Sequence, residues 1–124
     1  MESLPQEVIH AWENREGPMV FTTVSRDGSP NSIYATSMSI YDGETILVAD
    51  NYFEKTLANI RVGSRGSILF FTKERKSYQV KGLIEYYTDG QYFENMKRWN
   101  PDRLPGKGTA ALKVGEVYSG ARRL

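Results

Sequence analysis

MVFTTVSRDGSPNSIYATSMSIYDGETILVAD, residues 19–50, contains three runs rich in β-branched and aromatic residues, separated by two Asp-Gly pairs. Asp-Gly suits the positive φ angles of tight hairpin turns. The pattern therefore predicts an antiparallel meander of three consecutive strands, joined by turns at Asp27-Gly28 and Asp42-Gly43. Neither face of the middle strand, about 31–41, is charged along its whole length. We expect its outer face to be covered by a ligand or by a second subunit.

The rest of the chain adds three further strands and three short helices. Alternation of apolar and polar residues predicts strands at about 67–72, 77–88 and 109–119, with a charged turn at 73–76. Helical spacing predicts a first helix that ends near Asn14. Asn51 with Glu54, and Thr88 with Gln91, have the spacing of capping boxes, which predicts helices at about 52–62 and from about residue 89 onward.

The number and length of the strands favour a barrel. The chain has 124 residues, 40% of them hydrophobic, which suffices for one compact domain over residues 1–124. Six short antiparallel strands in so small a domain must avoid open edges, and closure into a barrel is the usual solution. We therefore expect a mainly β fold with short helices, built as a six-stranded antiparallel β-barrel.

Composition excludes several classes of function. The formal net charge of +1 is too balanced to drive non-specific binding of nucleic acid. The chain has no cysteine, which excludes metal sites with thiolate ligands. It has one histidine, His10, and this composition excludes most hydrolytic triads. The first residues of the sequence contain neither the basic region nor the apolar region of a signal peptide, so we expect a cytoplasmic protein.

The most informative polar residues follow the third predicted strand, in VADNYFEKTLANIR at 48–61. The first N–H groups of a helix attract anions, to which Lys55 adds a charge and Thr56 a hydroxyl. Asn59 shares their side of the helix and could add an amide donor. These donors make the segment a candidate site for a phosphate monoester. Taken alone, the same residues would also be typical of a helix face exposed to solvent.

The run DGETILVADNYFEKTLANI, residues 42–60, resembles the small FMN-binding proteins of the pyridoxamine 5'-phosphate oxidase-like family. The resemblance extends from about Ala11 to Leu124 and implies a Greek-key split β-barrel. It also implies a cofactor, FMN, whose phosphate Lys55 and Thr56 would hold. The other positions that it assigns to the flavin site are Tyr34, Ala35, Thr36, Ser37, Asp50, Asn51 and Gln79.

The resemblance implies a homodimer with FMN at the subunit interface, and an oxidoreductase or electron carrier of unidentified substrate. This chain differs from the oxidase in two respects. Glu54 stands where the oxidase has an arginine, and the chain lacks the longer C-terminal region that serves the pyridoxal substrate. Two alternatives stay open. One is the same fold with another cofactor, F420 or haem. The other is a small β-barrel that binds single-stranded nucleic acid.

Overall fold

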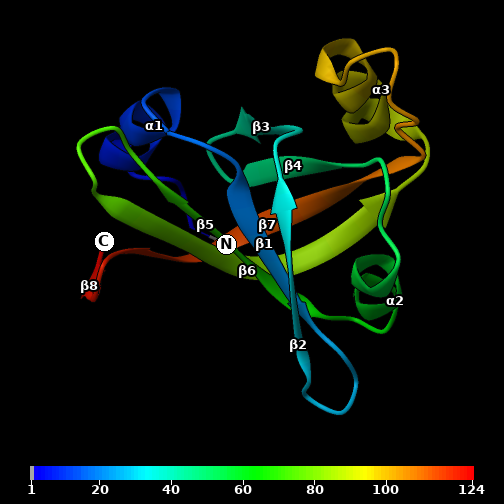
Figure 1. Cartoon of the computed structure of the whole chain (residues 1–124), viewed down its shortest axis with the longest axis horizontal. Coiled ribbons are helices and arrows are strands. Elements are labelled where there is room, and N and C mark those ends of the chain that lie inside the picture. Colours follow the sequence, from blue (N-terminus) through cyan, green and yellow to red (C-terminus); the bar gives the residue numbers. More distant parts are fainter. Residues whose placement is uncertain (1) are drawn as a thin grey trace.

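The computed structural model describes residues 2–124, in which helices lie at the ends of a curled antiparallel sheet (Figure 1). The helices are α1 (Gln6–Glu13), α2 (Lys55–Arg61) and α3 (Gly90–Trp99). The strands are β1 (Met19–Val24), β2 (Pro30–Ala35), β3 (Met38–Asp42), β4 (Thr45–Asp50), β5 (Arg65–Phe71), β6 (Ser77–Tyr87), β7 (Gly108–Ser119) and β8 (Arg122–Arg123). Within residues 2–124, no helix has the length and apolar character needed to cross a membrane.

The strand order is β2-β1-β5-β6-β7-β4-β3, with β8 paired to β7. Its two outermost strands, β2 and β3, are separated in sequence only by Thr36 and Ser37. The two edges of the sheet must therefore meet at this link, which curls the sheet into a barrel that is split between β2 and β3. The mainly β class and the split-barrel architecture are confirmed.

The predicted single strand at about 31–41 is wrong. It breaks at Thr36 and Ser37 because its two halves have different partners: β2 pairs with β1, whereas β3 pairs with β4 at the other end of the strand order. One straight strand cannot lie at both edges, so the chain bends between them. This break and the short β8 raise the expected six strands to eight.

Both predicted capping boxes are wrong as well. Helix α2 begins at Lys55 with Glu54 at its N-cap position, and α3 begins at Gly90 with Asp89 at that position. Neither N-cap residue makes a side-chain capping hydrogen bond. Both capping boxes were predicted from residue spacing alone. The Asn51 side chain instead forms a hydrogen bond with Asn100, which is distant in sequence.

The inner face of the sheet forms the core. Four side chains at most 2% exposed lie next to one another across four neighbouring strands: Phe21, Ile68, Val80 and Val117. Helix α1 covers one end of the barrel, where Trp12 packs edge-on against Phe70 with 5.3 Å between ring centroids. Helices α2 and α3 lie toward the other end (Figure 1).

The opposite face of β2, β1 and β5 carries apolar side chains toward solvent. Val20 pairs in register with Tyr34 on one side and with Leu69 on the other. Tyr34 is 77% exposed and Leu69 41%, and Phe71, two residues further along β5, is 38% exposed. We call Val20, Tyr34, Leu69 and Phe71 the outer sheet face.

Candidate functional site

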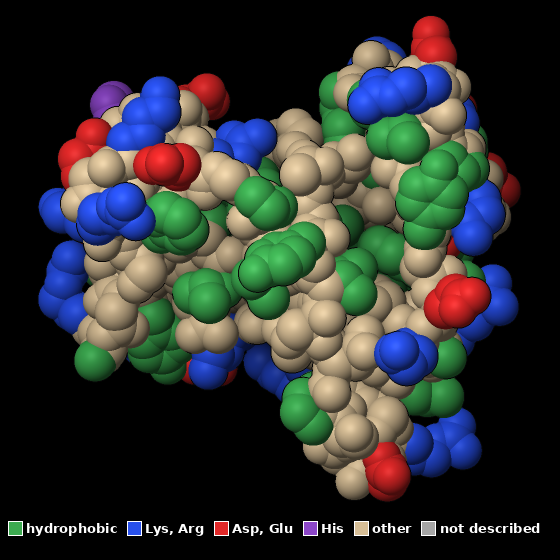
Figure 2. All heavy atoms as spheres, viewed as in Figure 1, with side chains coloured by type: hydrophobic (Ala, Val, Ile, Leu, Met, Phe, Trp, Pro, Cys, Tyr) green, Lys and Arg blue, Asp and Glu red, His purple; other side chains and the backbone are tan. Residues whose placement is uncertain are grey.

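A cavity of about 410 Å³ opens where β2 meets the link to β3. Its walls come from that link, from the turn between β4 and α2, and from the loop between α3 and β7. Figure 2 shows the surface hollowed between the α3 lobe and the centre of the same face. The lining residues are Ile33, Tyr34, Ala35, Thr36, Ser37, Ala49, Asn51, Tyr52, Phe53, Arg103 and Leu104. Five of the ten predicted site residues, Tyr34, Ala35, Thr36, Ser37 and Asn51, are among them.

A second compartment of about 310 Å³ adjoins this cavity and shares Thr36 and Ser37 with it. Trp99 and Pro101 form its opposite wall, and Met38 and Ser39 complete the lining. The two-residue link between β2 and β3 therefore has a cavity on each side. We call the larger one the main cavity and the smaller one the Trp99 compartment.

Asp50 holds the turn that leads into the main cavity. The side chain is fully buried, and its Oδ1 accepts a hydrogen bond from the Phe53 N–H at 2.9 Å. Its Oδ2 accepts a hydrogen bond from the Tyr86 hydroxyl at 2.5 Å. Burial first, and then this hydrogen bond to Asp50, raise the pKa of Tyr86 above its ordinary value. Asp50 therefore shapes the wall of the cavity without lining it.

Asn51 ties two walls of the main cavity together. Its amide exchanges hydrogen bonds with the Asn100 amide at 3.1 and 2.9 Å, and its Oδ1 also accepts from the Gly106 N–H at 2.9 Å. The loop between α3 and β7 is thereby attached to the end of β4. The side chain that the sequence predicts as a helix cap instead fixes the position of this loop.

The three residues predicted to hold a phosphate do not form one polar surface. Lys55 is exposed at the start of α2. Thr56 is 1% exposed, and its Oγ1 accepts a hydrogen bond from the Asn31 amide at 3.3 Å. Asn59 donates to the Thr23 hydroxyl at 3.0 Å inside the barrel, because α2 turns this face toward β1. The amide donor proposed for Asn59 therefore points into the protein.

Gln79 lies far from the main cavity of its own chain. It follows Tyr34, Val20 and Leu69 in one row across the sheet, three strands away from Tyr34. At the usual strand spacing this is a separation of roughly 14 Å. A contact between Gln79 and a ligand in the main cavity would have to come from another subunit.

Sequence reasoning missed Arg103, which is the only charged side chain among the residues that line the main cavity. No ion pair involving Arg103 occurs within residues 2–124. Its position depends on the loop that Asn51 anchors, a contact across 49 residues of sequence. No local pattern could have identified it.

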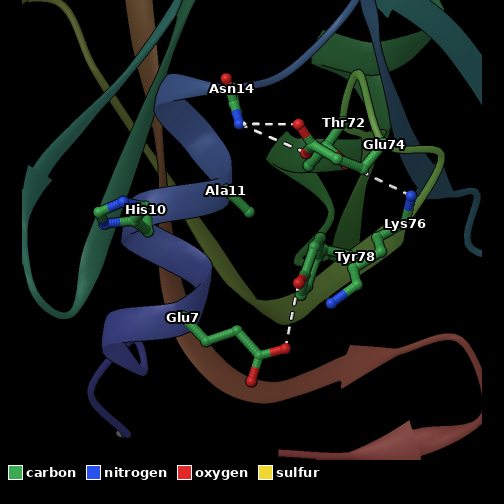
Figure 3. Close-up of a pocket in the computed structure, with 8 residues that line it drawn as sticks. All are labelled: Glu7, His10, Ala11, Asn14, Thr72, Glu74, Lys76 and Tyr78. Atoms are coloured by element: carbon green, nitrogen blue, oxygen red, sulfur yellow. Dashed lines mark hydrogen bonds between the residues drawn. The ribbon is translucent and has the colours of Figure 1, made fainter.

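A further cavity of about 330 Å³ lies between α1 and the turn that joins β5 to β6 (Figure 3). None of the predicted site residues lines it, although His10 does. Its two carboxylates are already engaged: Glu7 accepts from the Tyr78 hydroxyl at 3.1 Å, and Glu74 accepts from the Asn14 amide at 3.3 Å. These contacts hold α1 against the sheet, so we place the candidate site at the main cavity.

The fold and this site define a small split barrel with a ligand-sized cavity at the split. The family model described as pyridoxamine 5'-phosphate oxidase matches residues 5–119. An uncharacterised protein of Methanocaldococcus jannaschii is 34% identical in an alignment that covers 94% of this chain and 80% of the relative. The chain belongs to the pyridoxamine 5'-phosphate oxidase family.

Solved structures agree with this assignment. HupZ of Group A Streptococcus is 28% identical, with a TM-score of 0.81 over 94% of this chain and 93% of that one. An FMN-binding protein from Syntrophomonas wolfei shares the fold at 20% identity, with a TM-score of 0.74 over 88% of this chain and 80% of that one. An F420 reductase and HutZ, the haem storage protein of Vibrio cholerae, share it at 16% identity each. The fold thus occurs in proteins named for three different cofactors.

Proposed function

We propose that this protein binds FMN in the main cavity and serves as a flavin-dependent oxidoreductase or electron carrier. The observation that carries the proposal is the composition of the cavity: about 410 Å³, with exposed aromatic rings, and with hydroxyls and one arginine that have no side-chain partner among residues 2–124. Its volume is in the range of cofactor sites. When bound, the isoalloxazine ring supplies the redox chemistry, and the protein supplies position and hydrogen bonds.

The residues present suit a flavin phosphate. Lys55 lies two residues after Phe53, which lines the cavity, and no ion pair involving it occurs in the described part of the chain. Its ammonium is therefore available to an anion, and we propose that it meets the flavin phosphate at this end of the cavity. Arg103 lines the cavity from the loop. Tyr34 and Tyr52, 77% and 73% exposed, offer ring faces that a planar ligand would cover.

Haem is a weaker candidate for the same cavity. The most common protein ligand of haem iron is a histidine. His10 is the only histidine of the chain, and it lines the cavity beside α1 rather than the main cavity. Flavin, whose recognition requires no metal ligand, is the better match to these side chains.

A homodimer would complete the site. The outer sheet face begins at Tyr34, which also lines the main cavity, so a second copy on this face would lie beside the ligand. Gln79 of a second copy could then contact a ligand that Gln79 of the same chain cannot reach. We propose this arrangement, with one FMN at each cavity.

The decisive experiment is an absorption spectrum of the purified protein from 300 to 600 nm, with heat-released ligand identified by mass. We expect flavin bands and the mass of FMN. A colourless protein that does not bind added FMN would overturn the proposal, and release of F420 or haem would replace the cofactor.

The phosphate position can be tested by titrating the ligand-free protein with FMN and with riboflavin. We expect Lys55→Ala to weaken FMN binding by about 1.5 to 3 kcal/mol, the usual contribution of a charge-assisted hydrogen bond, and to leave riboflavin binding unchanged. Arg98→Ala, which removes an exposed cation outside the main cavity, is the matched control. Equal losses for both flavins in Lys55→Ala would contradict the assignment.

A further inference from the structure

The Trp99 compartment contains several polar groups without protein partners. The hydroxyls of Thr36, Ser37 and Ser39 make no hydrogen bond to any residue in 2–124, whereas other hydroxyls of this chain, such as those of Ser25 and Thr109, do. Each free hydroxyl can donate one hydrogen bond and accept two. A ligand in this compartment would meet three such groups on one wall.

The opposite wall is an aromatic surface. Trp99 is half-buried at the end of α3, and its indole N–H already donates to the Asn95 side chain at 2.9 Å. The ring therefore has no unsatisfied polar atom to offer and contributes area for stacking. Pro101 extends this apolar wall.

The compartment contains no charge. None of its six lining residues is charged, whereas the main cavity has Arg103. Removing a charged group from water without an opposite partner is costly. A charged ligand is thus disfavoured here, and an uncharged ring with carbonyl or amide groups fits both walls.

We propose that the Trp99 compartment is the binding site for a second ligand of this protein, an uncharged aromatic compound that stacks on Trp99 and hydrogen-bonds to the Thr36, Ser37 and Ser39 hydroxyls. The proposal rests on the proposed function, since the first ligand is the flavin of the main cavity. The shared link at Thr36 and Ser37 would hold the two ligands side by side. We expect the second ligand to be neutral because the Trp99 compartment has no charged lining residue, whereas the main cavity has Arg103.

Tryptophan fluorescence gives a direct test, because the chain has only two tryptophans and Trp12 is 5% exposed. The probes are nicotinamide and nicotinate, which share a ring and differ by a charge. We expect saturable quenching by nicotinamide in the FMN-loaded protein and at least about tenfold weaker binding of nicotinate, the equivalent of about 1.4 kcal/mol. Trp99→Phe should abolish the saturable quenching and should lower nicotinamide binding measured by equilibrium dialysis.

Ser39→Ala keeps the fluorescent reporter and removes one hydroxyl, and we expect it to weaken nicotinamide binding several-fold. Ser32→Ala, in β2 and outside the compartment, is the matched control. Three outcomes would overturn the inference: nicotinate binds as tightly as nicotinamide or more tightly, Trp99→Phe leaves nicotinamide binding in dialysis unchanged, or FMN displaces nicotinamide.

FMN absorbance in the same samples separates the two proposals. Bound FMN without bound nicotinamide refutes the second-ligand proposal alone, and bound nicotinamide without bound FMN refutes the proposed function.

Discussion

Among single residues, Asp50 shows how a residue can be important to a site that it does not touch. Its carboxylate is fully buried and receives hydrogen bonds from the Phe53 N–H and the Tyr86 hydroxyl. The resemblance to the flavin-binding proteins places Asp50 beside the ligand, yet it does not line the main cavity. It acts as a support for the turn that carries Asn51 and Tyr52, which do line it.

Tyr86→Phe tests this support. The substitution leaves Asp50 Oδ2 buried without its hydroxyl donor, and we expect the free energy of unfolding to fall by about 1 to 3 kcal/mol. Chemical denaturation at pH 7 measures this loss. Tyr118→Phe is the control, because that hydroxyl donates to Glu116, which is partly exposed to solvent. A loss as large in the control would contradict the special role of Asp50.

The same pair predicts an alkaline loss of stability. The pKa of Tyr86 is raised in the folded state, so the fold favours the protonated hydroxyl. Its contribution is complete below the unfolded pKa of about 10 and is lost as the pH rises through the folded pKa. We expect unfolding free energies above pH 10 to fall more steeply in the wild type than in Tyr86→Phe. Parallel curves for the two proteins would refute this coupling.

At the scale of elements, the pairing of β6 with β7 is the largest contact in the sheet, and its close approach depends on Gly82. The register between these strands shifts after Lys81, and a Cβ at Gly82 would lie 1.8 Å from the Lys113 carbonyl oxygen. Backbone cannot yield to such an overlap without separating the strands. The glycine therefore permits the bulge that lets both long strands follow the curvature of the barrel.

Gly82→Ala should accordingly destabilise the protein by about 2 to 4 kcal/mol, within the range reported for overpacking and strain. Gly43→Ala is the matched control, since a Cβ there meets no atom within 4 Å, and its effect should stay within about 0.5 kcal/mol. Thermal unfolding of both variants, followed by circular dichroism, provides the comparison. A tolerant Gly82 would mean that β6 and β7 are less closely paired than described.

For the whole molecule, the unexplained feature is the outer sheet face, Val20, Tyr34, Leu69 and Phe71. Three of these four large apolar side chains are more than a third exposed, and one of them, Tyr34 of β2, also lines the main cavity. Exposed apolar area of this kind marks an interaction surface. The occupant that we propose is a second copy of the chain, whose Gln79 would then lie beside the ligand.

Leu69→Asp places a charge in this surface, and we expect it to convert a dimer to a monomer and to weaken FMN binding at the same time. Analytical ultracentrifugation gives the mass, and flavin titration gives the affinity. Val62→Asp, at an apolar residue 44% exposed beyond α2, should leave both unchanged. A wild-type monomer, or a monomeric variant with full FMN affinity, would refute the dimeric site.

The features that could be predicted before the structure depend on residues that are neighbours along the chain. The Asp-Gly turns, the alternation in β6 and the apolar spacing of the helices predict the mainly β class, because turn angles and side-chain direction are set locally. Recognition of residues 42–60 added the family and a list of candidate residues. Half of that list lines the main cavity, including Tyr34 in β2 and Ser37 in the link between β2 and β3.

The partners that these residues contact depend on how distant segments pack in the folded chain. The break between β2 and β3 follows from closure of the barrel, and Asn51 meets Asn100 across 49 residues rather than capping α2. Asn59 is directed to Thr23, and Arg103 reaches the main cavity through a loop anchored from another element. Hydrogen bonds and packing between distant segments outweigh local preferences of about 1 kcal/mol, such as a helix cap, and no spacing in the sequence encodes them.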